Sequence, residues 1–156
     1  EMLRSLVGSE MCIRDSRQAL DIPLDARISL GARLNLAARL MEQGELDEAI
    51  ALTQTATQRA PEVALGWYNL GLMLRRRGDI AAALEAYSRA VELDPNNAAC
   101  HQNRAVALLL GGDIEGSRAA FRTAITLLET QGRPVDAQAL RTKAQGIVKL
   151  DLEPIA

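Results

Sequence analysis

Aromatic residues, cysteine and histidine are scarce in this chain of 156 residues, and it has no long apolar run. The two cysteines provide neither a disulfide framework nor a cluster of metal ligands. No apolar stretch approaches the roughly 20 residues that span a bilayer. A formal net charge of −2 offers no basic face for nucleic acid. What remains is a 48% hydrophobic chain whose apolar content comes mostly from alanine and leucine, as expected for packed helices.

The clearest pattern runs from Ala64 to Asn97 and predicts two helices joined by a tight turn. Gly78 supplies the positive φ that ends the first helix, and Asp79 can cap the second. Pro95 cannot continue that second helix. Small residues on the facing sides allow the two backbones to approach, and two large aromatic side chains fill the space beside them. The first helix presents Trp67, Leu70, Gly71 and Leu74, and the second presents Ala83, Tyr87 and Ala90.

This arrangement resembles a tetratricopeptide repeat (TPR), a unit of about 34 residues with the pattern W-x2-L-G-x2-Y…A-x3-F…P. Leu74 stands where Tyr is usual, and Tyr87 stands where Phe is usual. Residues 30–63 and 98–131 resemble two further repeats on either side of residues 64–97. Arg33 and Thr53 replace the usual aromatics of the first, which is therefore expected to pack less tightly. His101 replaces the Trp of the third.

The resemblance implies an all-α fold: an α-solenoid of three TPR hairpins, because one hairpin cannot bury its own apolar face. Residues 132–150 are expected to form a helix that caps the last repeat, with Pro134 in its first turn. Residues 151–156 would be a short tail. Seven helices are expected in total. The apolar stripe of the capping helix comprises Ala137, Leu140, Ala144, Ile147 and Val148.

Residues 1–16 fit neither the helical period nor the repeat, and they resemble the conceptual translation of a sequencing adapter. We expect this segment to be an artefact, which would make Cys12 non-native and leave the natural N-terminus missing. Residues 17–29 are interpreted as the remnant of a preceding repeat or as the lead-in to the first helix. A first helix longer by one turn would absorb the extra spacing.

Each of the three repeats has an asparagine at its sixth position. These residues are Asn35, Asn69 and Asn103. The resemblance implies that the first helix of each repeat lines a concave groove and that this position faces a bound peptide. An amide both donates and accepts hydrogen bonds, so it can hold a peptide backbone whatever the peptide's side chains are. The alternative is that Asn is simply common at this position of the family pattern.

Tyr68 and Gln102 precede two of these asparagines and are expected to border the groove. Arg75 and Arg76 lie near the end of the same helix as Tyr68. They could complement the negative helix end, which we favour, or attract an acidic peptide. Some TPR proteins clamp a C-terminal carboxylate with Lys and Arg, but the matching positions here hold Ala99 and Asn103, which disfavours that mode.

The adjacent pair Cys100 and His101 could suggest a nucleophile or a metal site, but adjacent helical residues point about 100° apart. We therefore interpret both as packing residues.

No catalytic, cofactor or metal motif is evident. The predicted function is a non-enzymatic module that binds a protein or peptide in the TPR groove. The compartment is left open, with the cytoplasm favoured. The alternative is the helical repeat arm of a larger enzyme, for example a transferase, whose catalytic domain lies outside this fragment.

Overall fold

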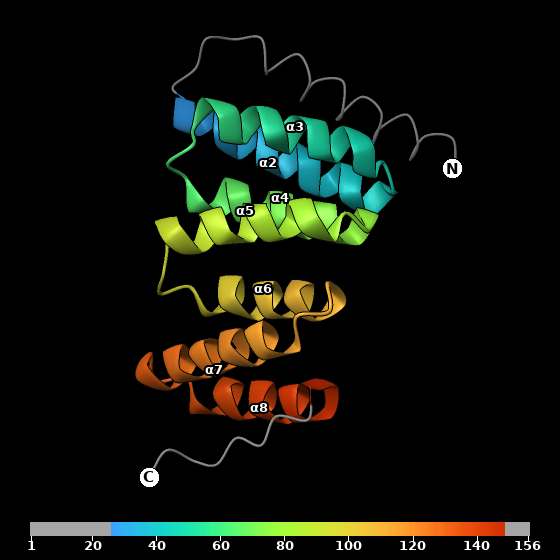
Figure 1. The fold of residues 1–156 in the computed structure, drawn as a ribbon. Helices are drawn as coiled ribbons and strands as arrows, with labels where there is room; N and C mark the ends of the chain where they lie inside the picture. The colour runs from blue at the N-terminus through green and yellow to red at the C-terminus, as the bar shows by residue number, and fades with distance from the viewer. Residues whose placement is uncertain (1–25, 149–156) are drawn as a thin grey trace, which may run out of the picture. The chain divides into compact units, whose positions relative to one another are not determined.

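The computed structural model describes residues 26–148, and the regular structure in that range is entirely α-helical (Figure 1). The expected all-α class is therefore confirmed. The adapter-like segment 1–16, most of residues 17–29 and the tail 151–156 lie outside the described residues. The helices are α2 (Ala26–Gln43), α3 (Leu46–Arg59), α4 (Ala64–Arg77), α5 (Ile80–Leu93), α6 (Ala98–Leu110), α7 (Ile114–Thr130) and α8 (Pro134–Val148).

The chain divides into two compact units, one ending at Glu62 and the other beginning at Val63. In the first unit, α2 packs antiparallel against α3 (Figure 1). Helix α2 begins at Ala26, about one turn ahead of Leu30. Thr53 is fully buried where the repeat usually has an aromatic residue, and its hydroxyl donates to the Ala49 carbonyl at 2.8 Å. The polar replacement is therefore satisfied locally.

In the second unit, α4 pairs with α5, α6 pairs with α7, and α8 packs on α7 (Figure 1). The core joining α6, α7 and α8 is centred on Phe121, which is fully buried. Helix α8 contributes four buried apolar residues: Ala137, Leu140, Ala144 and Val148. The predicted stripe was wrong at Ile147, which is 44% exposed. Ile147 lies at the edge of the stripe, and Val148, about 100° further around the helix, takes the buried place in the last turn.

The turns within the hairpins share one geometry. Gly44, Gly78 and Gly112 have φ of 87°, 93° and 87°. In each turn, the glycine N–H bonds to the carbonyl three residues back and the next N–H bonds to the carbonyl five residues back from itself. This is the Schellman ending of a helix, which satisfies carbonyls that have no intrahelical partner. Asp79 then caps α5 by accepting from the Ala82 N–H at 3.3 Å, as the sequence predicted.

Tyr87 is the packing centre of the α4–α5 hairpin and is fully buried. Gly71 makes this possible, because a Cβ at that position would lie 2.7 Å from the Tyr87 ring. The Tyr68 ring packs at a tilt against Tyr87, with 6.3 Å between the ring centroids. Trp67 was expected to share this space but is only partly buried. A bulky indole is rarely enclosed on all sides.

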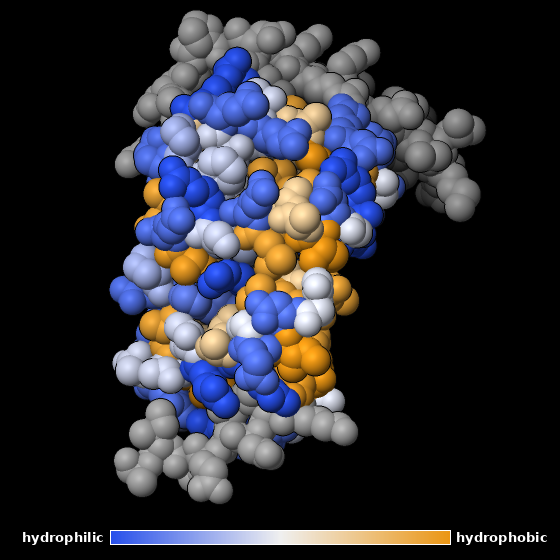
Figure 2. All heavy atoms as spheres, in the orientation of Figure 1, coloured by the Kyte–Doolittle hydropathy of each residue, from blue (hydrophilic) through white to orange (hydrophobic). Residues whose placement is uncertain are grey.

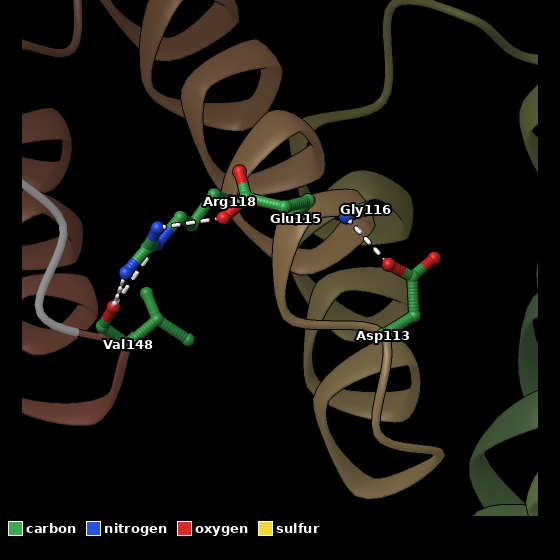
Figure 3. A network of polar contacts seen from close by, with 5 residues as sticks. All are labelled: Asp113, Glu115, Gly116, Arg118 and Val148. Atoms are coloured by element: carbon green, nitrogen blue, oxygen red, sulfur yellow. Dashed lines mark hydrogen bonds and ion pairs between the residues drawn. The ribbon is translucent and has the colours of Figure 1, made fainter.

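The C-terminal end of α8 is held by a side chain from α7 (Figure 3). Arg118 donates from Nε and Nη2 to the Val148 carbonyl at 3.2 and 3.1 Å, and its Nη1 pairs with Glu115 at 2.7 Å. At the start of α7, Asp113 accepts from the Gly116 N–H at 2.8 Å. Helix α8 is thus fixed both by its apolar stripe and by this polar contact.

Figure 2 shows hydrophilic and hydrophobic side chains intermixed over the visible face. Hydrophobic side chains are more frequent on the right-hand side of this view, which includes the turn between α6 and α7. Leu110 and Ile114, which flank that turn, are 58% and 49% exposed. Single exposed apolar residues of this kind are common on protein surfaces and need no partner to explain them.

Candidate functional site

Helices α4 and α6 lie next to each other in the second unit and carry most of the residues predicted to bind a partner. Asn69 on α4 and Asn103 on α6 are both partly buried, so part of each residue is accessible to solvent. Asn35 is exposed on α2 of the first unit. We call the partly exposed face of α4 and α6 the α4–α6 surface. It comprises Tyr68, Asn69, Leu72, Arg75, Arg76, Gln102, Asn103 and Val106.

Asn103 is oriented by two hydrogen bonds of its own. Its Nδ2 donates to the Tyr68 hydroxyl at 3.1 Å and to the Ala99 carbonyl at 3.0 Å. A carbonyl oxygen can only accept, so the amide must direct its nitrogen toward Ala99. Both N–H groups are then used within the protein, and the side-chain carbonyl of Asn103 is the group left for a ligand.

Asn69 differs from Asn103, although the two occupy equivalent positions in their repeats. Its amide makes no hydrogen bond to the described part of the chain. It can therefore both donate to a ligand and accept from one. The sequence predicted the same capacity for every asparagine of the series. The difference arises because the neighbouring repeat places a tyrosine beside Asn103.

Arg75 lies close to both tyrosines of the α4–α5 hairpin. Burial raises the pKa of Tyr68 and of Tyr87, and the Arg75 charge opposes that rise in both cases. The neutral phenol is therefore the form that Tyr68 presents on the surface. Arg76 is exposed, and Arg77 pairs with Asp79 at 3.3 Å. All three arginines stand in the last turn of α4, where a positive charge complements the helix end.

Cys100 and His101 pack inside the second unit. Cys100 is fully buried, and burial raises the pKa of its thiol to about 11, with the charge of Asp94 adding to the rise. His101 is 8% exposed, and its Nε2 lies 2.9 Å from the Pro95 carbonyl. Both residues therefore pack in the interior, and the contact of His101 with Pro95 joins α6 to the turn before it.

A pocket of about 280 Å³ adjoins the α4–α6 surface, between the first half of α6 and α8. The sequence analysis missed it, because its charged residues belong to α8 and to the turn before it, which lie outside the repeat pattern. It also missed the apolar residues three positions after each asparagine, Leu72 and Val106, although their spacing was visible in the sequence. The pocket is lined by Ala98, Ala99, Gln102, Leu128, Arg133, Asp136, Ala139, Leu140 and Lys143.

Residues 26–148 contain no cluster of three or more His, Cys, Asp or Glu side chains that could hold a metal ion. Within the same residues, none of the helices is both long enough and apolar enough to cross a membrane.

Comparison with known proteins agrees with the helical pattern. A family model described as tetratricopeptide repeat matches residues 34–98 and again residues 78–136, which together cover more than half of the chain. Among curated protein sequences, none matches the chain significantly.

Three solved structures illustrate the shared fold. The Yersinia enterocolitica type III secretion chaperone SycD, in complex with a peptide of the translocator YopD, is 17% identical, with a TM-score of 0.69 over 78% of this chain and 90% of that one. PcrH, in complex with the chaperone-binding region of PopD, is 23% identical, with a TM-score of 0.70 over 81% and 92%. The TPR2B domain of yeast Sti1, in a complex with pHsp70, is 18% identical, with a TM-score of 0.67 over 72% and 90%.

Proposed function

Because the chain belongs to the tetratricopeptide repeat family, we propose that it is a binding module that holds an extended segment of a partner protein against its α4–α6 surface. The observation that carries the proposal is the pair Asn69 and Asn103. They stand one repeat apart on neighbouring helices, with amide groups available to solvent. The SycD and PcrH structures, in which a similar fold is in complex with a segment of another protein, support it.

The spacing suits an extended backbone. Neighbouring packed helices lie roughly 8–10 Å apart, and an extended chain advances about 3.3 Å per residue. Asn69 and Asn103 would therefore contact backbone groups about three residues apart. Asn103 offers its carbonyl to a ligand N–H, and Asn69 can meet either an N–H or a carbonyl. These hydrogen bonds to the backbone do not depend on which side chains the ligand carries.

The apolar members of the surface supply the rest of the binding energy in this proposal. Leu72 and Val106 are partly exposed beside the two asparagines. A ligand side chain that covers them removes apolar area from water at about 25 cal/mol per Å². Since the helices are already packed, the surface is preformed and the ordering cost falls mainly on the ligand. The function proposed for residues 26–148 is binding, without catalysis.

The test is selection of short random peptides displayed on phage, followed by titration of one selected peptide against variants. Asn69→Ala combined with Asn103→Ala should weaken binding roughly ten- to hundredfold, because each lost hydrogen bond costs on the order of 0.5–1.5 kcal/mol. The control is Glu85→Ala with Arg89→Ala, two exposed positions on α5. If the asparagine variant binds as well as the parent while the α5 variant fails, the second helices form the binding face and the proposal is wrong.

A further inference from the structure

We propose that the α6–α8 pocket, lined by the residues named above, binds one aliphatic side chain of the ligand and that Lys143 binds an acidic side chain next to it. The inference deepens the proposed function and rests on it, because the pocket shares Gln102 with the α4–α6 surface and its lining residue Ala99 accepts a hydrogen bond from Asn103. The occupant is therefore a peptide segment that carries an aliphatic residue adjacent to Asp or Glu.

The pocket has room for an aliphatic side chain, and its lining suits one. Its volume of about 280 Å³ falls just below the roughly 300–1,000 Å³ of typical small-molecule sites. The apolar floor comes from three buried residues on three helices: Ala98 of α6, Leu128 of α7 and Leu140 of α8. Ala99 and Ala139 add small apolar walls, and a branched aliphatic side chain can enter between them without displacing charge.

The charge at the pocket rim is positive, although the whole chain carries −2. Arg133 pairs with Asp136 at 2.7 Å, which neutralises one cation of the rim. Lys143 has no ion-pair partner among residues 26–148. An exposed ammonium beside an apolar floor favours a carboxylate one or two residues from the buried side chain, since an extended chain advances about 3.3 Å per residue.

The walls of the pocket are fixed in the free protein. Asn97 caps α6 by accepting from the Cys100 N–H at 3.3 Å. Gln131 donates to the Asn96 carbonyl at 2.7 Å, which ties the α7–α8 turn to the start of α6. The bond from Arg118 to Val148 holds the far end of α8. Little entropy is therefore lost by the protein when the pocket is filled.

The experiment selects phage-displayed peptides on the whole protein and on two variants. Ala139→Leu fills the pocket from an exposed wall position, and Lys143→Glu reverses the rim charge. The parent should enrich peptides with an aliphatic residue one or two positions from Asp or Glu. Because displayed peptides are fused at their C-terminus, an enriched carboxylate must be a side chain. Ala119→Leu and Arg122→Glu, at exposed positions of α7, are the matched controls.

For one selected peptide, Ala139→Leu should weaken binding roughly ten- to hundredfold, and Lys143→Glu about three- to tenfold. The effect of Lys143→Glu should shrink when the acidic residue of the peptide is changed to its amide. Selected peptides that depend on Asn69 and Asn103 but ignore both α8 variants would overturn this inference and leave the proposed function intact. Failure of the asparagine variant to weaken any selected peptide would overturn both.

Discussion

Asn103 donates a hydrogen bond of 3.1 Å to the hydroxyl of Tyr68, a residue of the preceding repeat. The bond joins α4 to α6 across the surface proposed to bind the partner. It also decides which atom of Asn103 faces the ligand, because the second N–H is held by Ala99 of the same helix. A contact within the free protein therefore sets the chemistry offered to a partner.

The first prediction measures this bond. Tyr68→Phe and Asn103→Ala, made singly and together, should show a coupling of about 0.5–1.5 kcal/mol in the free energy of unfolding, as expected for a partly buried neutral hydrogen bond. Urea melts of the parent and the three variants give the value. Additive effects would mean that the two side chains do not interact in solution.

The second prediction concerns the core. Phe121→Ala should lower the free energy of unfolding by about 3–5 kcal/mol, because the ring is fully buried between α6, α7 and α8. Trp67→Ala should cost less, since the indole is only partly buried. Denaturant melts of the two variants provide the comparison. A larger loss for Trp67→Ala would show that the sequence pattern, and not the burial, identifies the anchor.

The third prediction tests the close approach of α4 and α5. Gly71→Ala should destabilise by about 1–3 kcal/mol, because the new Cβ would lie 2.7 Å from the Tyr87 ring. The matched control is Gly31→Ala, also within a helix but with no atom within 4 Å of the new Cβ. It should stabilise by about 0.5–1 kcal/mol through helix propensity. Thermal melts should therefore move in opposite directions, and parallel shifts would refute the packing argument.

The fourth prediction concerns the end of α8. Arg118→Ala removes both hydrogen bonds to the Val148 carbonyl, so the last turn of α8 should exchange its amide hydrogens faster (Figure 3). Arg122→Ala, an exposed position one turn further along α7, should leave that exchange unchanged. Hydrogen exchange read by mass spectrometry separates the two. Equal protection in both variants would show that the apolar stripe alone holds the helix.

The fifth prediction follows from Cys100. Its pKa is raised from 9.0 to about 11, and the thiolate is the reactive form. With Cys12→Ser removing the other thiol, the native protein should alkylate roughly a hundredfold more slowly at about pH 8 than the urea-unfolded chain. Because the folded state holds the proton more tightly, the stability contributed by Cys100 is complete below about pH 9 and is lost as pH rises through about 11. Fast native alkylation would place the thiol at the surface.

Much of the fold could be predicted because its signals are local and periodic. The turn glycines, the Asp79 cap and the small residues around Tyr87 each specify a backbone feature within a few residues. Helix α7 continues to Thr130 because Glu129 stands where the repeat pattern has the proline that would have stopped it. Errors occur where a pattern meets the end of an element. Ile147 fits the apolar stripe, but 44% of it is exposed.

The site was less predictable, because it depends on contacts between residues distant in sequence. The asparagine register was visible, yet the bond from Asn103 to Tyr68 depends on rotamers and on the approach of α4 to α6. The α6–α8 pocket combines Gln102 with charged residues on α8 and in the turn before it, outside the repeat pattern. Periodicity within one repeat contains no information about such pairings.

The three hairpin turns have nearly the same geometry, so they are equivalent points at which a whole repeat could be inserted or removed. Gly44, Gly78 and Gly112 leave their helices with nearly the same φ and the same pair of backbone hydrogen bonds. Cutting the chain at equivalent points of two such turns and rejoining it brings together ends of matching backbone geometry. Duplication or deletion of a whole repeat at these points would therefore keep the turn geometry, and the contacts between the newly adjacent repeats would decide whether the product is stable.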